Sequence, residues 1–400
     1  MKFTLLALSA TLAAALASPA PAHRQATDLF NFDQQSGYGP GAGVVTDTHG
    51  TIFGTNPGGG SGSCSGGSGC GTIYALKPPA KRGQSWTLDV LYDFQNAGDG
   101  WSPQAPVTLG PQGSLFGYPA AGSYGTVFQL VRPAKGSKIW TYQVLYTFTN
   151  GADGNLLYVI APLIWHSNAL YGIASGGSNA CGQTGCGSLF RLTPPQAGNG
   201  SWSEKTLFSF LGGTTGGEPD SIISSRSGNS LYVATVNGNG AVVEIAPGGH
   251  GAWTETVLTN FNGGKDGSRP ANLVLAADGT IYGTANRNRT GGIVFQLAQS
   301  SGTWTRTNIA DVSFHRYGPA SLALGANGSL VGVVEGDFDF FAGNVFQLTS
   351  SGDIWSVKQL WNFNRGPDRN PLGVVTGLGG HLYGVLNGGD SDNGSVFELK

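Results

Sequence analysis

The chain has 400 residues, of which 67 are Gly and 20 are Pro; only 11% are charged, and the formal net charge is −2. A charge so close to zero provides no basic field of the kind that draws nucleic acid or an anionic membrane to a protein, so we expect neither as a partner. Short β-branched and aromatic segments between Gly-rich turns are typical of an all-β protein rather than of helices or a disordered Gly-rich chain.

The N-terminal residues form a separate segment. Lys2 precedes an apolar run over 3–17 that is too short to span a bilayer and ends in the small-x-small sequence Ala15-Leu16-Ala17. These features predict a signal peptide over 1–17, a short linker over 18–26 and one domain over 27–400. No later segment is long and apolar enough for a membrane span, so we expect a secreted, extracellular protein.

Four landmarks then recur in the same order seven times. They are Leu-aromatic-x-Phe, a Pro that opens the next apolar run, aliphatic-aromatic-Gly, and Val-Phe-x-Leu. The second unit shows them at 91–94, Pro103, 115–117 and 127–130; the third unit lacks the Pro, and the sixth has a degraded first landmark at 309–312. A period of roughly 50 residues with four short strands is typical of a β-propeller blade.

The second unit predicts strands over 107–109, 115–118, 126–131 and 140–148, the last with alternating apolar residues. A Trp opens this fourth strand in six units: Trp86, Trp140, Trp202, Trp253, Trp304 and Trp355. We expect these rings to fill the wedges between neighbouring blades, with a functional aromatic box as the alternative.

The two ends of the chain complement each other. The last unit has three strands, and the mature chain begins with an unaccompanied fourth strand at 28–32. If this strand completes the last blade, two exposed sheet edges disappear. The sequence therefore predicts a single seven-bladed β-propeller closed by its N-terminal strand, and we expect a monomer.

Cysteines and sequons agree with export. Two pairs, Cys64 with Cys70 and Cys181 with Cys186, occupy equivalent positions between the third and fourth landmarks, which predicts two local disulfides. Zinc ligation is the alternative, but no His or further Cys is close in sequence. Glycosylation sequons begin at Asn199, Asn288, Asn327 and Asn393.

The whole pattern resembles the GloVer tandem repeat of secreted and surface-anchored proteins. The best match runs from Asn262-Gly263-Gly264-Lys265-Asp266-Gly267 through Ile281-Tyr282-Gly283-Thr284 to Val294-Phe295-Gln296-Leu297, and the resemblance covers nearly the whole mature chain. It implies a secreted repeat protein. The family has no agreed activity, so it transfers no catalytic residue.

One face of a propeller carries both the loops between blades and the loops between the second and third strands, and ligands usually bind there. The predicted inner strands are small and apolar, without a column of His or carboxylates, so we expect no cofactor. Asp99, Asp153 and Asp266 precede Gly in loops, a pattern that suits tight turns or, alternatively, calcium. Glu218 and Asp220 flank Pro219 on this face, either as a carboxylate pair or as solvated loop residues.

The repeat breaks in the sixth unit, and functional sites are expected where local sequence rules fail. One loop there carries His315, Arg316 and Tyr317, and the other carries Glu335, Asp337, Asp339 and Phe340. Arg287 and Arg289 lie in the neighbouring unit. A His beside carboxylates suits acid–base chemistry, so we name His315, Arg316, Tyr317, Glu335 and Asp337 as candidate catalytic residues, and Arg287, Arg289, Asp339 and Phe340 as ligand-binding. A degenerate blade with solvated charges is the alternative.

The sequence therefore favours a propeller that binds a small molecule or glycan on the face of the disulfide loops. A second hypothesis is a cofactor-free enzyme at the same face, a lyase, a hydrolase such as a lactonase, or an isomerase or cyclase. In that enzyme His315 would serve as acid or base, and Arg316 or Arg289 would hold an anion. A third is a structural or protein-interaction module.

Overall fold

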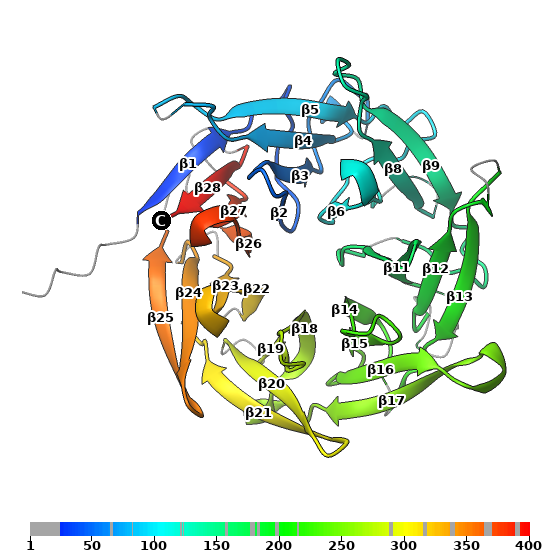
Figure 1. The fold of residues 1–400 in the computed structure, drawn as a ribbon, viewed down its shortest axis with the longest axis vertical. Coiled ribbons are helices and arrows are strands. Elements are labelled where there is room, and N and C mark those ends of the chain that lie inside the picture. Colours follow the sequence, from blue (N-terminus) through cyan, green and yellow to red (C-terminus); the bar gives the residue numbers. More distant parts are fainter. Residues whose placement is uncertain are drawn as a thin grey trace, which may run out of the picture.

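The computed structural model describes residues 25–400 except 65–66, 82, 121, 123, 157–158, 177–180, 182–184, 197–199, 214–215, 288–290, 315–317, 337–340, 364–369 and 389–392. In this part of the chain seven sheets of four strands each stand around a central axis (Figure 1). The fold is a seven-bladed β-propeller, as the repeat predicts. The predicted signal peptide and all but the end of the predicted linker lie outside the described residues, so these boundaries remain predictions.

Blades one to six each use four consecutive strands, numbered from the axis outward. Blades one to three consist of β2 (Val45–Thr46), β3 (Ile52–Asn56), β4 (Thr72–Lys77) and β5 (Thr87–Asp93); β6 (Thr108–Leu109), β7 (Leu115–Gly117), β8 (Thr126–Val131) and β9 (Thr141–Thr147); and β10 (Ile164–His166), β11 (Ala169–Ala174), β12 (Ser188–Thr193) and β13 (Ser203–Ser209). Blades four to six consist of β14 (Pro219–Ser224), β15 (Leu231–Thr235), β16 (Ala241–Pro247) and β17 (Trp253–Asn260); β18 (Ser268–Leu275), β19 (Ile281–Asn286), β20 (Gly292–Ser300) and β21 (Thr303–Asp311); and β22 (Pro319–Leu324), β23 (Leu330–Val334), β24 (Asn344–Ser351) and β25 (Ile354–Asn362).

Blade seven joins both ends of the chain. It contains β26 (Pro371–Thr376), β27 (Leu382–Leu386), β28 (Ser395–Leu399) and, outermost, β1 (Ala26–Asn31). β1 pairs antiparallel with β28, with Asp28 opposite Phe397 and Phe30 opposite Val396. The predicted closure by the N-terminal strand is confirmed.

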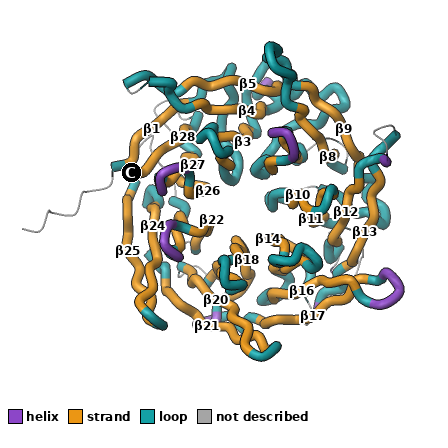
Figure 2. The backbone as a smooth tube through the Cα atoms, in the orientation of Figure 1, coloured by secondary structure: helices purple, strands orange, loops and turns teal. Residues whose placement is uncertain are grey.

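Short 3-10 turns connect some of the strands: η2 (Pro111–Gly113), η6 (Gly249–Gly251), η7 (Gly264–Asp266), η8 (Ala326–Gly328) and η9 (Leu378–Gly380). Figure 2 shows them as small purple segments on a ring made of strands and loops. Among the described residues no helix combines the length and the apolar character that crossing a bilayer requires.

Burial along the strands follows their distance from the rim. All residues of β23 and β27, the second strands of their blades, are buried, because another blade packs on each face. The outermost strand β17 alternates between half-buried and exposed residues over most of its length, because one of its faces meets solvent. Continuous apolar runs and alternating runs in one unit therefore mark middle and outer strands.

A Gly opposite an aromatic ring is the repeated cross-strand pair inside the blades. In blade five Gly283 faces Phe295, and a Cβ atom at Gly283 would lie 2.5 Å from the tip of that ring. The same pair recurs as Gly54–Tyr74, Gly117–Phe128, Gly172–Phe190, Gly332–Phe346 and Gly384–Phe397. Blade four exchanges both partners, so that Val233 faces Val243. Two medium side chains replace a small and a large one, which explains why the third and fourth landmarks degrade together in that unit.

A Gly–Pro contact joins one blade to the next. A Cβ atom at Gly71, just before β4, would lie 2.6 Å from Cδ of Pro103, just before the inner strand of blade two. Equivalent contacts are Gly187–Pro219, Gly240–Pro270, Gly292–Pro319, Gly343–Pro371 and Gly394–Pro40. In blade two, Gly125 meets Leu156 instead, because the third unit lacks the Pro. The second landmark is therefore a joint between blades.

The Phe of the first landmark secures the same joint. The N–H of Phe94 donates to the carbonyl of Gly71 at 3.1 Å, and its buried ring meets Phe128 of blade two edge-on at 6.0 Å. The same N–H bond recurs in Phe32–Gly394, Phe148–Gly125, Phe210–Gly187, Phe261–Gly240, Val312–Gly292 and Phe363–Gly343. In the sixth unit Val312 replaces the Phe but still makes this bond, because the donor is the backbone N–H group. Burying each such ring contributes about 2–3 kcal/mol.

Four of the six Trp residues that open outer strands contact an aromatic ring of the preceding blade. Trp355 of blade six meets Tyr282 of blade five at 5.6 Å. Comparable pairs are Trp86–Tyr383, Trp202–Phe116 and Trp304–Tyr232, with centroid distances of 5.9, 6.2 and 5.8 Å. The expected wedge role is confirmed for these four Trp residues.

Both predicted disulfides are present, Cys64–Cys70 and Cys181–Cys186. The carbonyl of Cys70 accepts the N–H of Ser102 at 2.8 Å, and the carbonyl of Cys186 accepts the N–H of Glu218 at 2.7 Å. Each disulfide loop therefore holds the start of the next blade's inner strand.

The Asp residues of the Asp-Gly loops accept hydrogen bonds from their own loops. Asp99 accepts the N–H groups of Gln95 and Ala97 at 2.9 and 2.8 Å, and Asp153 accepts those of Thr149 and Gly151 at 2.9 and 3.0 Å. This is the turn role anticipated for them. Within the described part of the chain no three His, Cys, Asp or Glu side chains gather into a metal-binding set. Calcium binding remains an untested prediction.

Candidate ligand site at the mouth of the axial channel

Most of the site predicted in the sixth unit falls outside the described residues. This applies to His315, Arg316, Tyr317, Asp337, Asp339 and Phe340, and to Arg289 of the fifth unit. The described members are Glu335 and Arg287. Of the sequon residues, Asn199 and Asn288 also lie outside, Asn327 is exposed in η8, and Asn393 is half-buried just before β28.

Arg287, predicted to bind ligand, directly follows β19 and forms an ion pair with Asp311 at the end of β21. Its guanidinium also donates to the carbonyl of Lys265 at 3.2 Å. Burial raises the pKa of Asp311, but hydrogen bonds from Ser313 and the charge of Arg287 outweigh this and hold that pKa below its usual range. The Arg287 guanidinium therefore links two loops of blade five.

Glu335 follows β23 and is half-buried, and burial raises its pKa. The N–H of the next residue, Gly336, donates to Oδ1 of Asn370 at 3.1 Å. Glu335 thus lies where blade six meets the start of the inner strand of blade seven.

A cavity of about 240 Å³ lies on the axis, between the inner strands. Six blades contribute to its wall, which is mostly Ala, Pro, Ile and Leu, as the sequence predicts for inner strands. Its polar side chains are Asp220, Ser221, Asn272 and Ser321. Among the described residues that line it, Asp220 is the titratable one.

Three of these polar groups hold the inner strands to one another. Ser221 accepts the N–H of Leu273 at 3.0 Å, and Ser321 accepts that of Val374 at 3.2 Å. The side-chain amide of Asn272 donates to the carbonyl of Pro319, the first residue of β22, at 3.4 Å and to Thr284 of its own blade at 2.9 Å. Because these groups are committed to the framework, Asp220 is the polar side chain of the wall best suited to meet a ligand.

Asp220 is the second residue of β14 and lies just after the blade joint at Pro219. Burial raises its pKa, and the positive charge of Arg269 from blade five lowers it by a smaller amount. Because Asp220 lies in strand β14 and is half-buried, its interpretation as a solvated loop residue is wrong. A half-buried carboxyl in a mostly apolar wall can exchange a proton or hold a polar ligand atom.

Arg269 occupies a backbone position with an unusual conformation. It precedes Pro270 and has a φ of 53°, and the pre-proline residues Ser102, Glu218 and Asn370 have φ values of 60°, 55° and 67°. A left-handed non-Gly residue costs about 1 kcal/mol or more, so the surrounding structure must enforce it. The N–H of Arg269 donates to the carbonyl of Asn239 at 2.7 Å, which fixes this position beside blade four.

A signal for Asp220 was present in the repeat. The residue after the landmark Pro is uncharged in the other units that have this Pro: Gly41, Gln104, Ala271, Ala320 and Leu372. A charge at a position where the other units keep small or uncharged residues marks Asp220 as unit-specific. Its surroundings, however, arise only when the ring brings the inner strands together.

Solved structures similar in shape to this chain differ widely in name. A proposed 6-phosphogluconolactonase from Bacteroides uniformis has 13% identity and a TM-score of 0.55, with 84% of this chain and 90% of that chain covered. One from Bacteroides fragilis has 13% identity and a TM-score of 0.53, with 89% and 94% covered. A chain of a mitotic checkpoint complex has 11% identity and a TM-score of 0.56, with 97% and 98% covered. Such low identities show a shared fold alone.

No curated protein matches the chain by sequence. The Gloeobacter/Verrucomicrobia repeat, in contrast, matches residues 161–397, which is more than half of the chain. The match includes blades four, five and six complete, with their Gly–Pro joints and the Phe residues that secure them. It confirms the resemblance drawn from the repeated landmarks, and the chain belongs to the Gloeobacter/Verrucomicrobia repeat family.

Proposed function

We propose that this propeller is an exported protein that binds a small molecule at the disulfide-loop end of its axial channel. The observation that carries the proposal is the axial cavity of about 240 Å³, with mostly apolar walls and one carboxyl, Asp220, whose pKa burial raises. An apolar hollow with a few convergent polar groups and a titratable residue of shifted pKa is typical of a ligand site.

The cavity restricts the ligand's size and chemistry. At roughly 30 Å³ for each water of liquid volume, 240 Å³ corresponds to about eight waters, which suits a single small ring better than an extended glycan. The apolar wall favours a ring with C–H faces. Asp220 can accept from a hydroxyl or, when protonated, donate, and the exposed side chain of Arg269, whose charge acts on Asp220, would be the nearest candidate to meet an oxygen of a ligand that protrudes from the cavity. A monosaccharide or its lactone combines these features.

Lactone hydrolysis is the second candidate, and the carboxyl of Asp220 in the cavity wall, on which the positive charge of Arg269 acts, favours it. The Asp220 carboxylate would take a proton from an attacking water while Arg269 stabilises the negative oxygen formed at the lactone carbonyl. The ring C–O bond then breaks, and the proton passes to the leaving oxygen. The names of the two Bacteroides structures make sugar lactones the first substrates to try. In the same proposal His315, Arg316 and Tyr317 of the sixth unit remain alternative acid–base or anion-holding groups.

The test is a thermal-shift and turnover screen with monosaccharides and sugar lactones. A ligand at about 100 times its Kd stabilises the folded protein by about 2.7 kcal/mol. Asp220→Asn and Arg269→Gln should each weaken binding by about tenfold, as expected for a lost charged hydrogen bond. Asp353→Asn, at an exposed loop position, is the matched control.

Three results separate the candidates. Binding of a ligand that is recovered unchanged supports the binding protein. Opening of a lactone ring that Asp220→Asn abolishes supports the lactonase. If Asp220→Asn and Arg269→Gln bind and turn over ligand like the Asp353→Asn control, the channel mouth is not the site, and the sixth-unit cluster is tested through His315→Ala.

Secretion and glycosylation belong to this proposal. The two disulfides are compatible with an oxidising, extracellular location. Mass spectrometry of protein recovered from culture medium should find a mature N-terminus at Ser18. It should also find glycan on Asn327, the exposed sequon residue; an intact Met1 terminus on the folded protein contradicts the export proposal.

A further inference from the structure

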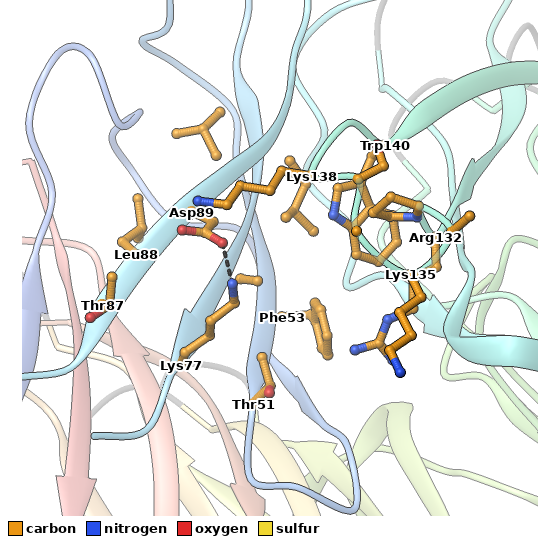
Figure 3. Close-up of a pocket in the computed structure, with 17 residues that line it drawn as sticks. Thr51, Phe53, Lys77, Thr87, Leu88, Asp89, Arg132, Lys135, Lys138 and Trp140 are labelled. Carbon is orange, nitrogen blue, oxygen red and sulfur yellow. Dashed lines mark hydrogen bonds and ion pairs between the residues drawn. The ribbon is translucent and has the colours of Figure 1, made fainter. Parts of the chain in front are cut away.

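A second hollow of about 810 Å³ lies between blades one and two (Figure 3). It is lined by the end of the β2–β3 turn at Thr51, by the facing ends of β4 and β5, and by the β8–β9 loop over 132–140. Strands alternate in direction, so these ends lie opposite the disulfide loop, which connects β3 to β4. This groove is therefore separate from the axial cavity and opens at the other end of the ring.

The charge of this groove contrasts with that of the whole chain. Its lining contains four cationic side chains, Lys77, Arg132, Lys135 and Lys138, and one carboxylate, Asp89. Asp89 pairs with Lys77, and the structure records no acidic partner within 4.0 Å for the other three in the described part of the chain. The lining thus carries a net charge of +3, although the chain as a whole carries −2, which leaves −5 for everything outside the groove.

The positive charge comes mainly from one loop of the repeat. The connection between the third and fourth strands reads Arg132-Pro133-Ala134-Lys135-Gly136-Ser137-Lys138 in the second unit. The corresponding loops of the third to sixth units contain no Lys or Arg. The corresponding loop of the first unit contains Lys81 and Arg82. Cations in this loop are therefore a feature of the first two units and not of the fold as a whole.

Among the described residues, this gap lacks the Trp ring contact that four other gaps have, as does the gap between blades three and four at Trp253. Four Trp residues at the equivalent position make a ring contact with the preceding blade at 5.6–6.2 Å. Trp140 and its expected partner Phe53 are both described, and the structure records no such contact between them. Figure 3 shows the two rings apart, with the hollow beside them. Trp140 is half-buried, so part of its ring is available at the groove wall.

We propose that this groove binds a short acidic oligosaccharide bearing carboxylate or sulfate groups. The three unpaired cations would neutralise its acidic groups, and the C–H face of a sugar would pack on Trp140. A short chain is favoured over a long polyanion such as nucleic acid. The charges outside the groove sum to −5, so a long polyanion that extends beyond it would gain no comparable attraction.

The experiment is calorimetric titration with tetragalacturonate and with a sulfated heparin tetrasaccharide, and the uncharged maltotetraose is the ligand control. We expect binding of at least one acidic tetrasaccharide, with loss of about tenfold in affinity when NaCl rises from about 20 to about 200 mM. The double variant Lys135→Glu/Lys138→Glu should weaken binding by about tenfold or more. Trp140→Phe, which keeps an aromatic ring in the wedge, should weaken it less.

The matched control is Lys205→Glu/Lys358→Glu, which makes the same charge change at exposed positions on β13 and β25. It should bind like the parent protein. Both pairs alter exposed side chains, and equal melting temperatures confirm that folding is unaffected. The proposal is overturned if neither acidic tetrasaccharide binds, if maltotetraose binds equally well, or if the control pair loses as much affinity. Tighter binding of a single-stranded oligonucleotide that depends on Lys135 and Lys138 overturns it in favour of nucleic acid.

Discussion

The interior of the blades and the two ends of the ring are built on different rules. Inside, the same pairs recur from blade to blade: a Gly opposite a ring, a Gly against a Pro, and a Phe N–H on a Gly carbonyl. At the ends, single units depart from the pattern, with Asp220 at one end and the loop over 132–138 at the other. Repetition therefore marks what the fold needs, and departure from it marks where this chain can have its own chemistry.

The largest effect is expected inside the blades, at Phe148. Its ring is 1% exposed and meets Phe190 edge-on at 5.1 Å. Phe148→Ala should lower the free energy of unfolding by about 3–5 kcal/mol, because it removes buried area and leaves a cavity. Urea unfolding measures this, and Ile354→Ala, at a side chain that is 76% exposed, is the control. A cost below about 1 kcal/mol at Phe148 would contradict the assigned role of this landmark.

The next largest effect on stability tests whether the Val233–Val243 pair of blade four can replace the Gly–ring pair of the other blades. Gly283→Val should cost about 1–3 kcal/mol, because its side chain would overlap Phe295. Phe295→Val alone should also destabilise. The double variant recreates the Val233–Val243 pair of blade four and should lose less than the sum of both single losses. Purely additive losses in a double-mutant cycle would mean that the exchange in blade four depends on other residues.

A smaller effect on stability is expected at Asp153, whose Asp-Gly loop recurs in several units, and it contrasts with the effect at Asp220, which is specific to the fourth unit. Asp153 has its pKa lowered, since hydrogen bonds from Thr149, Tyr146 and Gly151 outweigh the effect of burial. A carboxyl whose pKa is lower in the folded state stabilises the protein above its unfolded pKa, and this stabilisation is lost as the pH falls through the folded value. Asp153→Asn should therefore cost about 1 kcal/mol at pH 7 and progressively less below about pH 4. Melting temperatures across this range measure the difference.

The smallest effect on stability is expected at Asp220, and its dependence on pH should have the opposite sign to that at Asp153. Its pKa is raised in the folded protein, so its contribution is most favourable below the unfolded pKa and is lost as the pH rises through the folded value. Asp220→Asn should therefore be as stable as the parent protein, or slightly more stable, at pH 7, by less than about 1 kcal/mol. This advantage should disappear in acid. If the Asp220 and Asp153 variants show the same pH slope, the distinction between framework and channel carboxylates is wrong.

The sequence predicts the ring and its closure because each landmark is a local arrangement that recurs. The disulfides follow from equivalent Cys positions, and the wedge Trp residues from their constant place before the outer strand. Asp220 was misjudged because its burial depends on the inner strands of other blades, and no local pattern encodes that distance. The groove between blades one and two depends in the same way on side chains from two blades that meet only in the ring.

The pairing of β1 with β28 has a consequence for the order in which the molecule is made. Ser395 donates to the carboxylate of Asp28 at 3.1 Å across a separation of 367 residues. The earliest strand of the domain to leave the ribosome must therefore wait for the very last one before it acquires its neighbour. Contacts between such distant segments form late, since a long loop must close first. Until β28 forms, the ring is not closed and has an exposed sheet edge on each side of the gap. A chain that lacks a few C-terminal residues remains in this open state.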